Sequence, residues 1–394
     1  MHRPLRVLLT GLLAVATPAA AQEVDFGGSF TGELRWFPED PLSPEQLEAW
    51  QPSLVVEPSF SLRSKGGSHD LAIVPFFRLD GQDSERTHFD LREARWRGVF
   101  GDWELVAGVD RVFWGVTESR HLIDIVNQTD VLEDVDEEDK LGQPMLSVEW
   151  QQSWGRLTAM ALVGFRERSY PGPNGRLRFP LPVDDDATFP DGERAVDLAF
   201  RYSHFLGDFD LGLSVFNGIS REPSFRLDDS ETRLVPVYSE ITQAGLDLQY
   251  TRNAWLWKLE SLVRGGDGDT FGAVVAGFEY TRYQILGSAA DLGLLVEYLY
   301  DGRDETAPPT PFGQGLFVGA RLALNDVSDS TLLAGAVVDL DNGSIAARVE
   351  AERRLTANLK LEVESRIFTN TDHESFLNFF RRDSFVVARL GLFF

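Results

Sequence analysis

The sequence predicts an all-β protein in which about 18 strands, or 16 as the alternative, close into a single antiparallel barrel. Two observations predict this fold. Apolar and polar residues alternate with period two in segments of about ten residues. The connections between these segments alternate between short and long. The 394 residues include no Cys, so disulfides cannot stabilise the chain, whereas an uninterrupted ladder of backbone hydrogen bonds can.

The alternation is clear in the segment 344–354. One face carries Ile345, Ala347, Val349 and Ala351, and the other carries Ala346, Arg348, Glu350 and Glu352. Segments 255–265, 312–324 and 358–368 repeat the scheme. A soluble sheet would bury the apolar face, whereas a barrel in lipid turns it outward and lines its lumen with the charges. Alternation alone does not separate these two arrangements.

The lengths of the connections separate them. We expect strands at residues 24–37, 52–64, 70–80, 88–100, 103–113, 143–152, 156–165, 194–204, 208–219, 235–251, 255–265, 270–282, 290–300, 312–324, 330–340, 344–354, 358–368 and 384–394. Every second connection is short, and only Asp341, Asn342 and Gly343, where Asn-Gly predicts a type I′ turn, is a tight turn on the long side. Transmembrane barrels combine short periplasmic turns with longer extracellular loops. The sequence therefore predicts such a barrel with both termini in the periplasm.

The first 21 residues predict a secretory signal peptide. Arg3 and Arg6 precede an apolar stretch at 7–16 and small residues that end at Ala21. About ten apolar residues are too few to span a bilayer as a helix. The barrel is then residues 22–394. Of 37 basic residues two lie in the leader, so 35 remain against 62 acidic ones, and a net charge of −27 argues against nucleic acid as a partner.

The chain ends in SFVVARLGLFF, where Val386, Ala388, Leu390, Leu392 and Phe394 share one face. An amphipathic last strand with a C-terminal Phe resembles the end of Gram-negative outer-membrane β-barrels, a porin-like family. The resemblance implies a location in the bacterial outer membrane and contact with its lipid and lipopolysaccharide. It also implies that Phe394 is the assembly signal read by the barrel-assembly machinery.

Two features of the wall follow from residue type. Aromatic residues near strand ends are expected to form a girdle on the outer face. They are Trp36, Trp96, Trp103, Trp150, Tyr250, Trp255, Trp257, Tyr280, Tyr298, Tyr300 and Phe394. Pro58 and Pro75 each remove a hydrogen-bond donor from an expected strand, and so predict local bulges.

The charged face of the strands is expected to line the lumen. Acidic and basic residues interleave there in nearly equal numbers, which favours a polar, water-filled or charge-laced interior. The expected pore-lining residues are Arg95, Arg97, Arg264, Arg321, Arg348, Glu350, Arg354, Lys360, Glu362, Glu364 and Arg366.

The segment 114–142 is the most distinctive connection. Leu122, Ile123, Ile125 and Val126 make it too apolar to lie free in water. Such a loop either folds inward and narrows the channel or packs as an outer cap. By position it is similar to the inward third loop of general porins. In the inward arrangement, candidates for lining the constriction are Asp124, Asn127, Gln128 and Asp130.

We expect no catalytic site, metal site or cofactor. His88 or His121 with a Ser such as Ser119 would suit a hydrolase, because outer-membrane phospholipases and deacylases set a Ser and a His near the outer rim. No G-x-S-x-G, HExxH or Walker-type motif is present. The acidic runs 133–139 and 184–186 are expected in external loops, as solvated faces rather than sites for divalent cations.

These features predict a porin-like channel for passive diffusion of small polar solutes. One alternative is a dedicated transporter of anionic sugars or acidic polysaccharide, and another is a non-channel structural or adhesive barrel. An oligomer of barrels is also compatible with the sequence.

Overall fold

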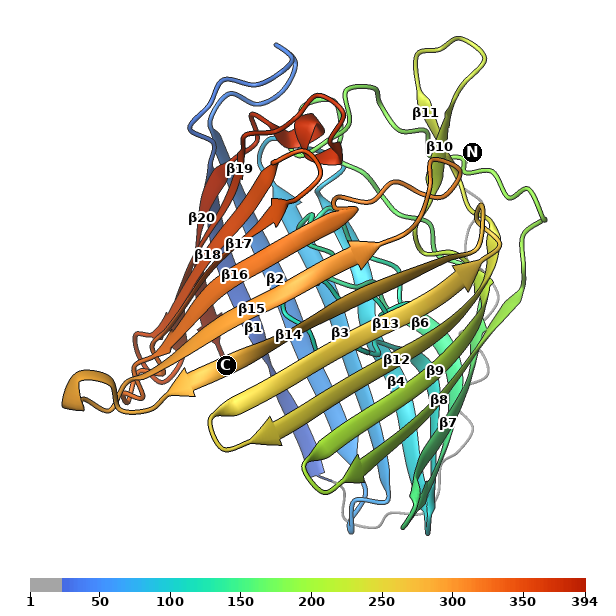
Figure 1. The fold of residues 1–394 in the computed structure, drawn as a ribbon. Helices are drawn as coiled ribbons and strands as arrows, with labels where there is room; N and C mark the ends of the chain where they lie inside the picture. Colours follow the sequence, from blue (N-terminus) through green and yellow to red (C-terminus); the bar gives the residue numbers. More distant parts are fainter. Residues whose placement is uncertain (1–22) are drawn as a thin grey trace.

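Eighteen long strands form one antiparallel sheet that closes on itself (Figure 1). The computed structural model describes residues 23–394; the expected signal peptide, residues 1–21, lies outside them. Each long strand pairs with the next one along the chain, and the last strand pairs with the first. The fold is therefore the single closed barrel that the sequence predicts, with 18 strands rather than 16.

The strands are 8 to 14 residues long. Their bounds are β1 (Glu23–Trp36), β2 (Trp50–Arg63), β3 (His69–Asp80), β4 (His88–Phe100), β5 (Trp103–Asp110), β6 (Gln143–Gln152), β7 (Gly155–Val163), β8 (Val196–Leu206), β9 (Phe209–Ile219), β12 (Glu240–Arg252), β13 (Trp255–Gly265), β14 (Phe271–Arg282), β15 (Asp291–Asp301), β16 (Gln314–Ala323), β17 (Thr331–Asp339), β18 (Ile345–Arg354), β19 (Leu359–Thr369) and β20 (Phe385–Phe393). We call the end at which β1 begins and β20 ends the short-turn side, and the opposite end the long-loop side.

Three elements lie outside the barrel wall. Two are the 3-10 turns η1 (Ile285–Gly287) and η2 (Phe376–Phe380). The third is a hairpin of β10 (Ser224–Leu227) and β11 (Leu234–Val237), which rises from the long-loop side (Figure 1). Within residues 23–394, no helix has the length and apolar character needed to cross a membrane.

Two expected strands have bounds that differ by more than two residues from those observed. The strand expected at 235–251 begins at Glu240, because the residues before it pair within the hairpin instead. The strand expected at 103–113 ends at Asp110. There the Asn127 side chain accepts a hydrogen bond from the Val112 N–H at 2.9 Å and donates one to the Asp110 carbonyl at 2.9 Å. These bonds replace ladder bonds and turn the chain away from the wall.

The alternation places an apolar belt on the outside of the barrel. On β20, Leu390 and Leu392 are exposed, whereas Phe385 and Val387 point inward and are buried. Aromatic pairs lie at both ends of the wall, as expected for a girdle. Trp36 and Trp50 stack at the long-loop side with ring centroids 6.0 Å apart, and Trp103 and Trp150 stack at the short-turn side at 5.4 Å.

The two prolines interrupt the ladder at one place. The β3–β4 register shifts between Val74 and Pro75, so that β4 has one extra residue, as expected for a bulge. The β2–β3 pairing stops for residues 57–59, and its register on either side places Pro58 opposite Pro75. The β1–β2 register runs through Pro58 without a shift, so the bulge belongs to Pro75 alone.

The tight turn on the long-loop side differs from its expected type. Only Gly343 has a positive φ, 78°, whereas a type I′ turn needs positive φ at both central residues. The Gly343 N–H bonds to the Asp339 carbonyl at 2.9 Å, and the Asp341 N–H bonds to the Asp339 carboxylate at 2.8 Å. The Asp339 side chain thus supports a four-residue turn, 340–343, that ends in a left-handed glycine.

Phe394 completes the seam between the last and first strands. Its backbone exchanges two hydrogen bonds with Gly28, each 3.1 Å long, and its ring stacks on Phe30 at 5.3 Å. Gly28 has φ 147°, and a side chain there would meet the Glu57 carbonyl oxygen at 2.6 Å. The seam therefore needs a glycine at one side and the terminal residue at the other.

Deletion of Phe394 should lower the amount of folded, heat-modifiable barrel in outer membranes while synthesis of the precursor is unchanged. The deletion removes both closing hydrogen bonds and the end that is expected to be recognised during assembly. Phe205→Ala removes an exposed ring at the β8–β9 turn without touching the seam, and should fold normally. Equal yields for the two variants would contradict this account of Phe394.

Charge should be tolerated on the inner face and not on the outer one. Val349 lies at the middle of β18 and faces outward, so Val349→Arg should lower the free energy of unfolding in lipid by about 2–4 kcal/mol. Thr31 of β1 lines the lumen, and Thr31→Arg should cost much less. Denaturant titrations in lipid vesicles measure both, and a larger cost for Thr31→Arg would show that the faces are reversed.

Candidate channel and its inner loop

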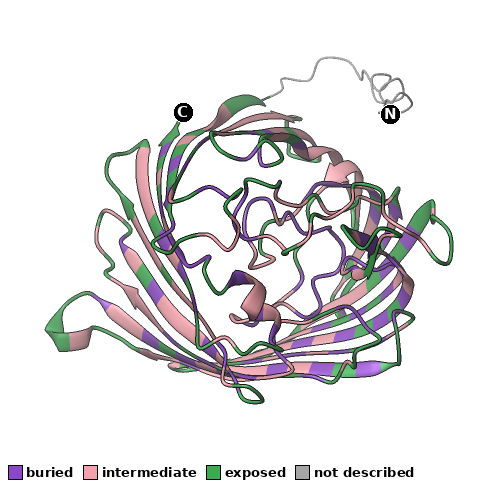
Figure 2. Ribbon diagram, turned by 90° about the horizontal axis from the view of Figure 1, so that it is seen from above, coloured by how far each residue is buried: buried purple, intermediate pink, exposed green. Residues whose placement is uncertain are grey.

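Residues 111–142, which we call the inner loop, fold into the barrel and contact its far wall. Figure 2 shows loop segments crossing the lumen. Contacts reach from the loop to the opposite wall, including β13, β15, β18 and β19. Of the two arrangements that the sequence allows, the structure has the inward one. The acidic run 133–139, expected outside, therefore lies in the lumen.

Two wall carboxylates hold the first part of the inner loop by its backbone. Glu260 of β13 accepts hydrogen bonds from the N–H groups of Val116 and Thr117, at 2.6 and 3.0 Å, and from the Thr117 hydroxyl at 2.7 Å. Glu297 of β15 accepts the N–H and the hydroxyl of Ser119 at 2.8 and 2.6 Å. Both carboxylates are buried. Charged acceptors of this kind contribute about 1.5–3 kcal/mol per hydrogen bond.

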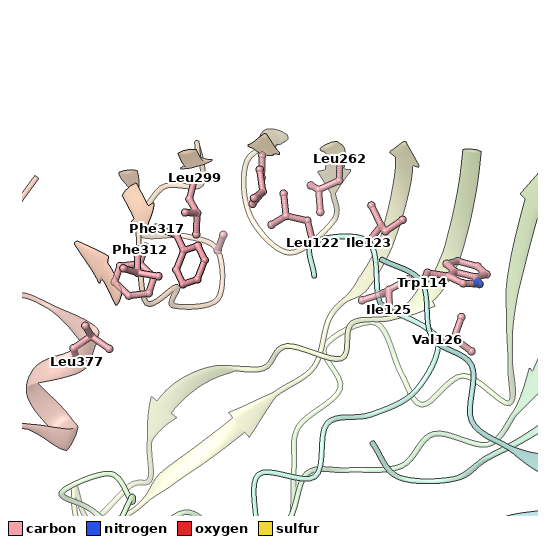
Figure 3. Packing of buried hydrophobic residues seen from close by; sticks show 14 of the residues in the cluster. Trp114, Leu122, Ile123, Ile125, Val126, Leu262, Leu299, Phe312, Phe317 and Leu377 are labelled. Atoms are coloured by element: carbon pink, nitrogen blue, oxygen red, sulfur yellow. The ribbon is translucent and has the colours of Figure 1, made fainter. Parts of the chain in front are cut away.

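Apolar side chains fix the same part of the loop against the wall. Leu122, Ile123, Ile125 and Val126 are all buried, and Figure 3 shows Leu122 and Ile123 beside Leu262 of β13. Burying each aliphatic side chain contributes roughly 1.5–3 kcal/mol. The half of the inner loop before residue 127 is therefore held by apolar packing and backbone hydrogen bonds, which add to the ion pairs of Glu118 and Arg120.

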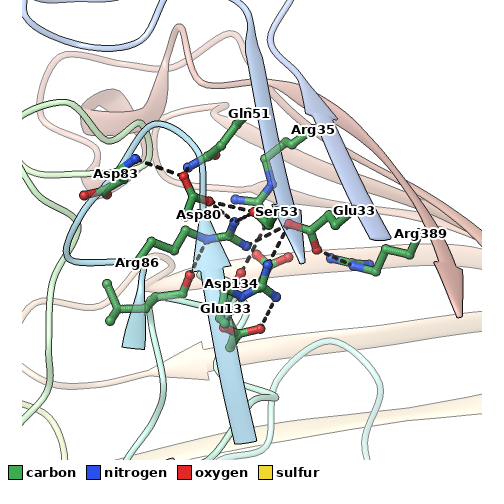
Figure 4. Close-up of polar contacts among 12 residues, drawn as sticks. Glu33, Arg35, Gln51, Ser53, Asp80, Asp83, Arg86, Glu133, Asp134 and Arg389 are labelled. Atoms are coloured by element: carbon green, nitrogen blue, oxygen red, sulfur yellow. Dashed lines mark hydrogen bonds and ion pairs between the residues drawn. The ribbon is translucent and has the colours of Figure 1, made fainter. Parts of the chain in front are cut away.

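The second half of the loop is held by charge. Glu133 pairs with Arg78 of β3, which also donates to Glu33 of β1 at 3.0 Å. Glu33 is fully buried and also accepts from Arg86 at 3.0 Å and from Arg389 at 2.8 Å. Figure 4 shows this convergence on Glu33. Through three arginines, the Glu33 carboxylate thus links β1 to β20, to the connection between β3 and β4, and to the inner loop.

The four residues expected to line the constriction are instead buried supports of the loop. Asp124 pairs with Lys140 at 3.2 Å, and Asn127 holds the chain where β5 ends. Gln128 donates to the Arg166 carbonyl at 3.1 Å, and Asp130 pairs with Arg92 at 2.7 Å. Their polar atoms serve the fold of the loop itself.

Asp130 is held in its charged form. Burial raises the pKa of this carboxyl, but His88, 3.4 Å away, and the charge of Arg92 outweigh burial and lower the pKa to about 2. Strict alternation from Arg95 and Arg97 would place Arg92 on the outer face. The bulge opposite Pro75 turns it inward, where it stacks on Phe76 at 4.3 Å. Pro75 predicted the bulge, and is the signal from which the inward position of Arg92 could have been inferred.

The expected pore-lining residues all lie on inward-facing positions, but their surroundings differ. Arg264 is buried and pairs with Glu222 from the segment 220–239, and lines neither of the two large cavities itself. Arg97 pairs with Glu104 at 2.6 Å on the wall, and Arg95 lies 3.2 Å from Asp110. Arg354 and Lys360 line a separate pocket at the short-turn side. The others line the two cavities described below: Arg321, Arg348, Glu350, Glu362, Glu364 and Arg366.

Strands β18 and β19 place like charges directly opposite each other. The paired positions are Arg348 with Arg366, Glu350 with Glu364, Glu352 with Glu362, and Arg354 with Lys360. Like charges in directly opposed positions destabilise a sheet. Partners from elsewhere offset this cost; Lys360, for example, bridges Glu352 and Glu362 at 2.7 and 2.8 Å. The ion pairs therefore run diagonally between the strands, along one strand, to β20 or to the inner loop.

Two cavities occupy the lumen, one above the other. The upper cavity, of about 720 Å³, opens among the long-loop segments, and the lower cavity, of about 810 Å³, lies toward the short-turn side. Five charged residues line both cavities, and so mark the place where they meet: Glu118, Asp136, Glu138, Arg348 and Arg366. Three of the five come from the inner loop. This meeting point is the candidate constriction.

The chemistry of the two cavities differs. The lower cavity has twelve acidic and five basic residues, so the near balance expected for the lumen is wrong there. The upper cavity includes an apolar wall, with Phe317, Phe368, Phe376 and Phe380 among its lining residues. The sequence did not predict this apolar wall, because an inward-facing Leu or Phe only interrupts the polar pattern of a strand and does not indicate an apolar lining.

The histidines considered for catalysis support ion pairs in the loop. His88 lies near Asp130 and Glu133, and His121 Nδ1 lies 3.9 Å from Glu260. Two groups of described residues bring three potential metal-ligand atoms within 4.8 Å: His88, Asp130 and Glu133, and Asp134, Asp136 and Glu364. Arginines already pair with carboxylates in both groups. That the protein has no catalytic or metal site stays a prediction.

Removing both wall carboxylates should loosen the inner loop. In the cysteine-free chain, Val126→Cys provides one buried thiol. Adding Glu260→Ala and Glu297→Ala should speed labelling of that thiol at least about tenfold, because a loss of 1.4 kcal/mol of local stability corresponds to tenfold more opening. Glu352→Ala with Glu362→Ala makes the same change in charge without touching the loop. Equal labelling rates in the two backgrounds would refute the anchoring role.

No protein-family model matches this chain, and neither does any curated protein. Solved structures do match. The chain is similar to a BenF-like porin from Pseudomonas fluorescens Pf-5, at 10% identity and a TM-score of 0.53, over 94% of this chain and 98% of that one. It is also similar to Wzi of Escherichia coli, an outer membrane protein involved in Group 1 capsule assembly and a carbohydrate-binding β-barrel. That match has 11% identity and a TM-score of 0.53, over 94% of this chain and 84% of that one.

At these identities the likeness concerns the fold. The chain has the porin-type fold of bacterial outer-membrane β-barrels. A closed barrel with an apolar outer belt and an aromatic girdle spans a membrane. The outer-membrane location predicted from the sequence agrees with this fold.

Proposed function

We propose that the protein is an outer-membrane channel for passive diffusion of small polar solutes, in which the inner loop sets the size limit. The observation that carries the proposal is the pair of cavities that meet at five charged residues. Charged groups at a narrow point replace part of the hydration that a solute loses there. The mechanism is passive and requires no catalytic residue or cofactor.

The charge of the lower cavity supports a preference for cations. Twelve acidic residues against five basic ones create a negative potential over that part of the path. Screening at a Debye length of about 8 Å at physiological salt weakens this preference as salt rises.

A dedicated transporter of anionic sugars or acidic polysaccharide is the second candidate. The opposed pair Arg348 and Arg366 favours it, because paired guanidinium groups suit carboxylates. The acidic lower cavity opposes it, since a polyanion would meet repulsion beyond the constriction. A structural or adhesive barrel without conductance is the third candidate. Contacts with lipopolysaccharide and with the barrel-assembly machinery are part of this proposal too.

Conductance and selectivity in planar bilayers test the proposal. Discrete steps in KCl are expected, with K⁺ preferred over Cl⁻ at about 0.1 M salt and a smaller preference at about 1 M. Glu352→Gln with Glu362→Gln should reduce the low-salt preference. Asp186→Asn with Asp229→Asn makes the same charge change on exposed loops and should leave it unchanged. Silence at high protein dose would favour the structural barrel, and anion selectivity that persists at high salt would favour the polyanion transporter.

A further inference from the structure

Three consecutive acidic residues of the inner loop, which we call the acidic tip, each contact a different arginine. The pairs are Asp136 with Arg366 of β19, Glu137 with Arg168 of the segment 164–195 at 3.4 Å, and Glu138 with Arg348 of β18 at 2.8 Å. The three arginines are mostly buried, and they reach the tip from three separate elements.

We propose that Arg168, Arg348 and Arg366 form a binding site for a polycarboxylate anion, which the acidic tip occupies as an internal ligand, and that an anion displacing the tip joins the two cavities. The proposal of a binding site depends only on the positions of the three arginines. The effect on the passage rests on the proposed channel function.

The wall requires an anion at this place. Arg348 and Arg366 are directly opposed in the β18–β19 ladder, so their charges repel unless negative groups lie between them. Glu350 contacts Arg348 at 3.4 Å, and Glu364 contacts Arg366 at 2.8 Å. Glu350 and Glu364 are the next inward-facing pair along the two strands. Those two acids are themselves opposed to each other, and the tip completes the neutralisation together with Glu118, which contacts Arg348 at 2.8 Å.

The tip is held less firmly than the rest of the inner loop. The side chains of Glu137 and Glu138 are 38% and 48% exposed to the lumen, and ion pairs in contact with water are weak and screened by salt. Glu137 has φ 67°, a left-handed conformation that residues with a side chain rarely adopt. The wall anchors Glu260 and Glu297 hold the other half of the loop, so the tip can leave its arginines while that half stays in place.

Movement of the tip would change the constriction directly. Asp136 and Glu138 line both cavities together with Arg348 and Arg366. A displaced tip removes two of the five residues at the meeting point. An anion that binds the arginines would therefore widen the passage as the tip swings away.

The acidic tip, as the internal ligand, indicates which class of external ligand the three arginines would bind. Planar guanidinium groups bind carboxylates through paired hydrogen bonds. Three carboxylates on one short segment act together, so a molecule with a single carboxylate competes at one arginine only, whereas a tricarboxylate competes at all three. Citrate is accordingly the probe, and acetate is its control with a single carboxylate. Inorganic phosphate tests whether the site binds a different class of anion.

The first experiment measures K⁺ conductance in bilayers at constant ionic strength, in buffers freed of divalent cations with an immobilised chelating resin. Citrate should raise the conductance of the wild-type channel about twofold or more, and acetate should not. Two double variants free the tip: Asp136→Asn with Glu138→Gln, and Arg348→Gln with Arg366→Gln. Both should show the raised conductance without citrate, and no further rise when citrate is added. Asp186→Asn with Asp229→Asn is the matched control and should behave as wild type. A wild-type response to phosphate but not citrate would overturn the polycarboxylate assignment.

Charge can also be restored chemically at the tip. The chain has no other Cys, so Glu138→Cys reacts at one position only. A negatively charged thiosulfonate reagent should bring the conductance down to the wild-type level, and a positively charged one should leave it raised. Equal effects of the two reagents would overturn the proposal.

Calorimetry on the folded barrel in detergent separates failure of the site from failure of the channel. Asp136→Asn with Glu138→Gln should bind citrate roughly tenfold more tightly than wild type, because the internal competitor is weakened. Arg348→Gln with Arg366→Gln should lose citrate binding. Silent bilayers together with this binding pattern would refute the channel and keep the site. Conducting bilayers without citrate binding would refute the site and keep the channel.

Discussion

Two buried carboxylates on the barrel wall, Glu260 and Glu297, determine how the lumen is organised. Each accepts hydrogen bonds from several successive groups of the inner loop. A polar backbone that crosses a barrel must find partners or pay the desolvation cost of unpaired N–H groups. The wall supplies those partners as charged acceptors, which are the strongest kind. The inner loop consequently lies across the lumen, and the constriction forms where its far half meets β18 and β19.

The inner loop combines two kinds of interaction that respond differently to conditions. Apolar packing of Leu122, Ile123 and Val126 does not depend on ionic strength. Ion pairs of the second half lie partly in lumen water and weaken with salt. Burial and the neighbouring Asp134 raise the pKa of Asp136 well above its usual value, in spite of the charge of Arg366. A rigid anchor and a labile contact thus occur within one connection.

Local patterns in the sequence were sufficient for the wall. Period-two alternation located all 18 long strands, the aromatic ends of β1, β5 and β6 followed from residue type, and Pro75 marked the bulge. The site was less accessible because it depends on register between distant segments. Arg348 faces Arg366 because of the register in which β18 pairs with β19. β5 ends at Asp110 because the side chain of Asn127, from further along the inner loop, donates a hydrogen bond to the Asp110 carbonyl. The polar residues expected at the constriction were therefore placed in the right loop but given the wrong neighbours.

Hydrogen exchange of the native barrel in lipid nanodiscs tests the central claim, that the wall carboxylates hold the inner loop inside the lumen. The amides of Val116, Thr117 and Ser119 should exchange as slowly as those of the neighbouring strands β13 and β15. Exchange of these amides as fast as that of the exposed turn between β10 and β11 would show that the loop is not held there, and would contradict the account.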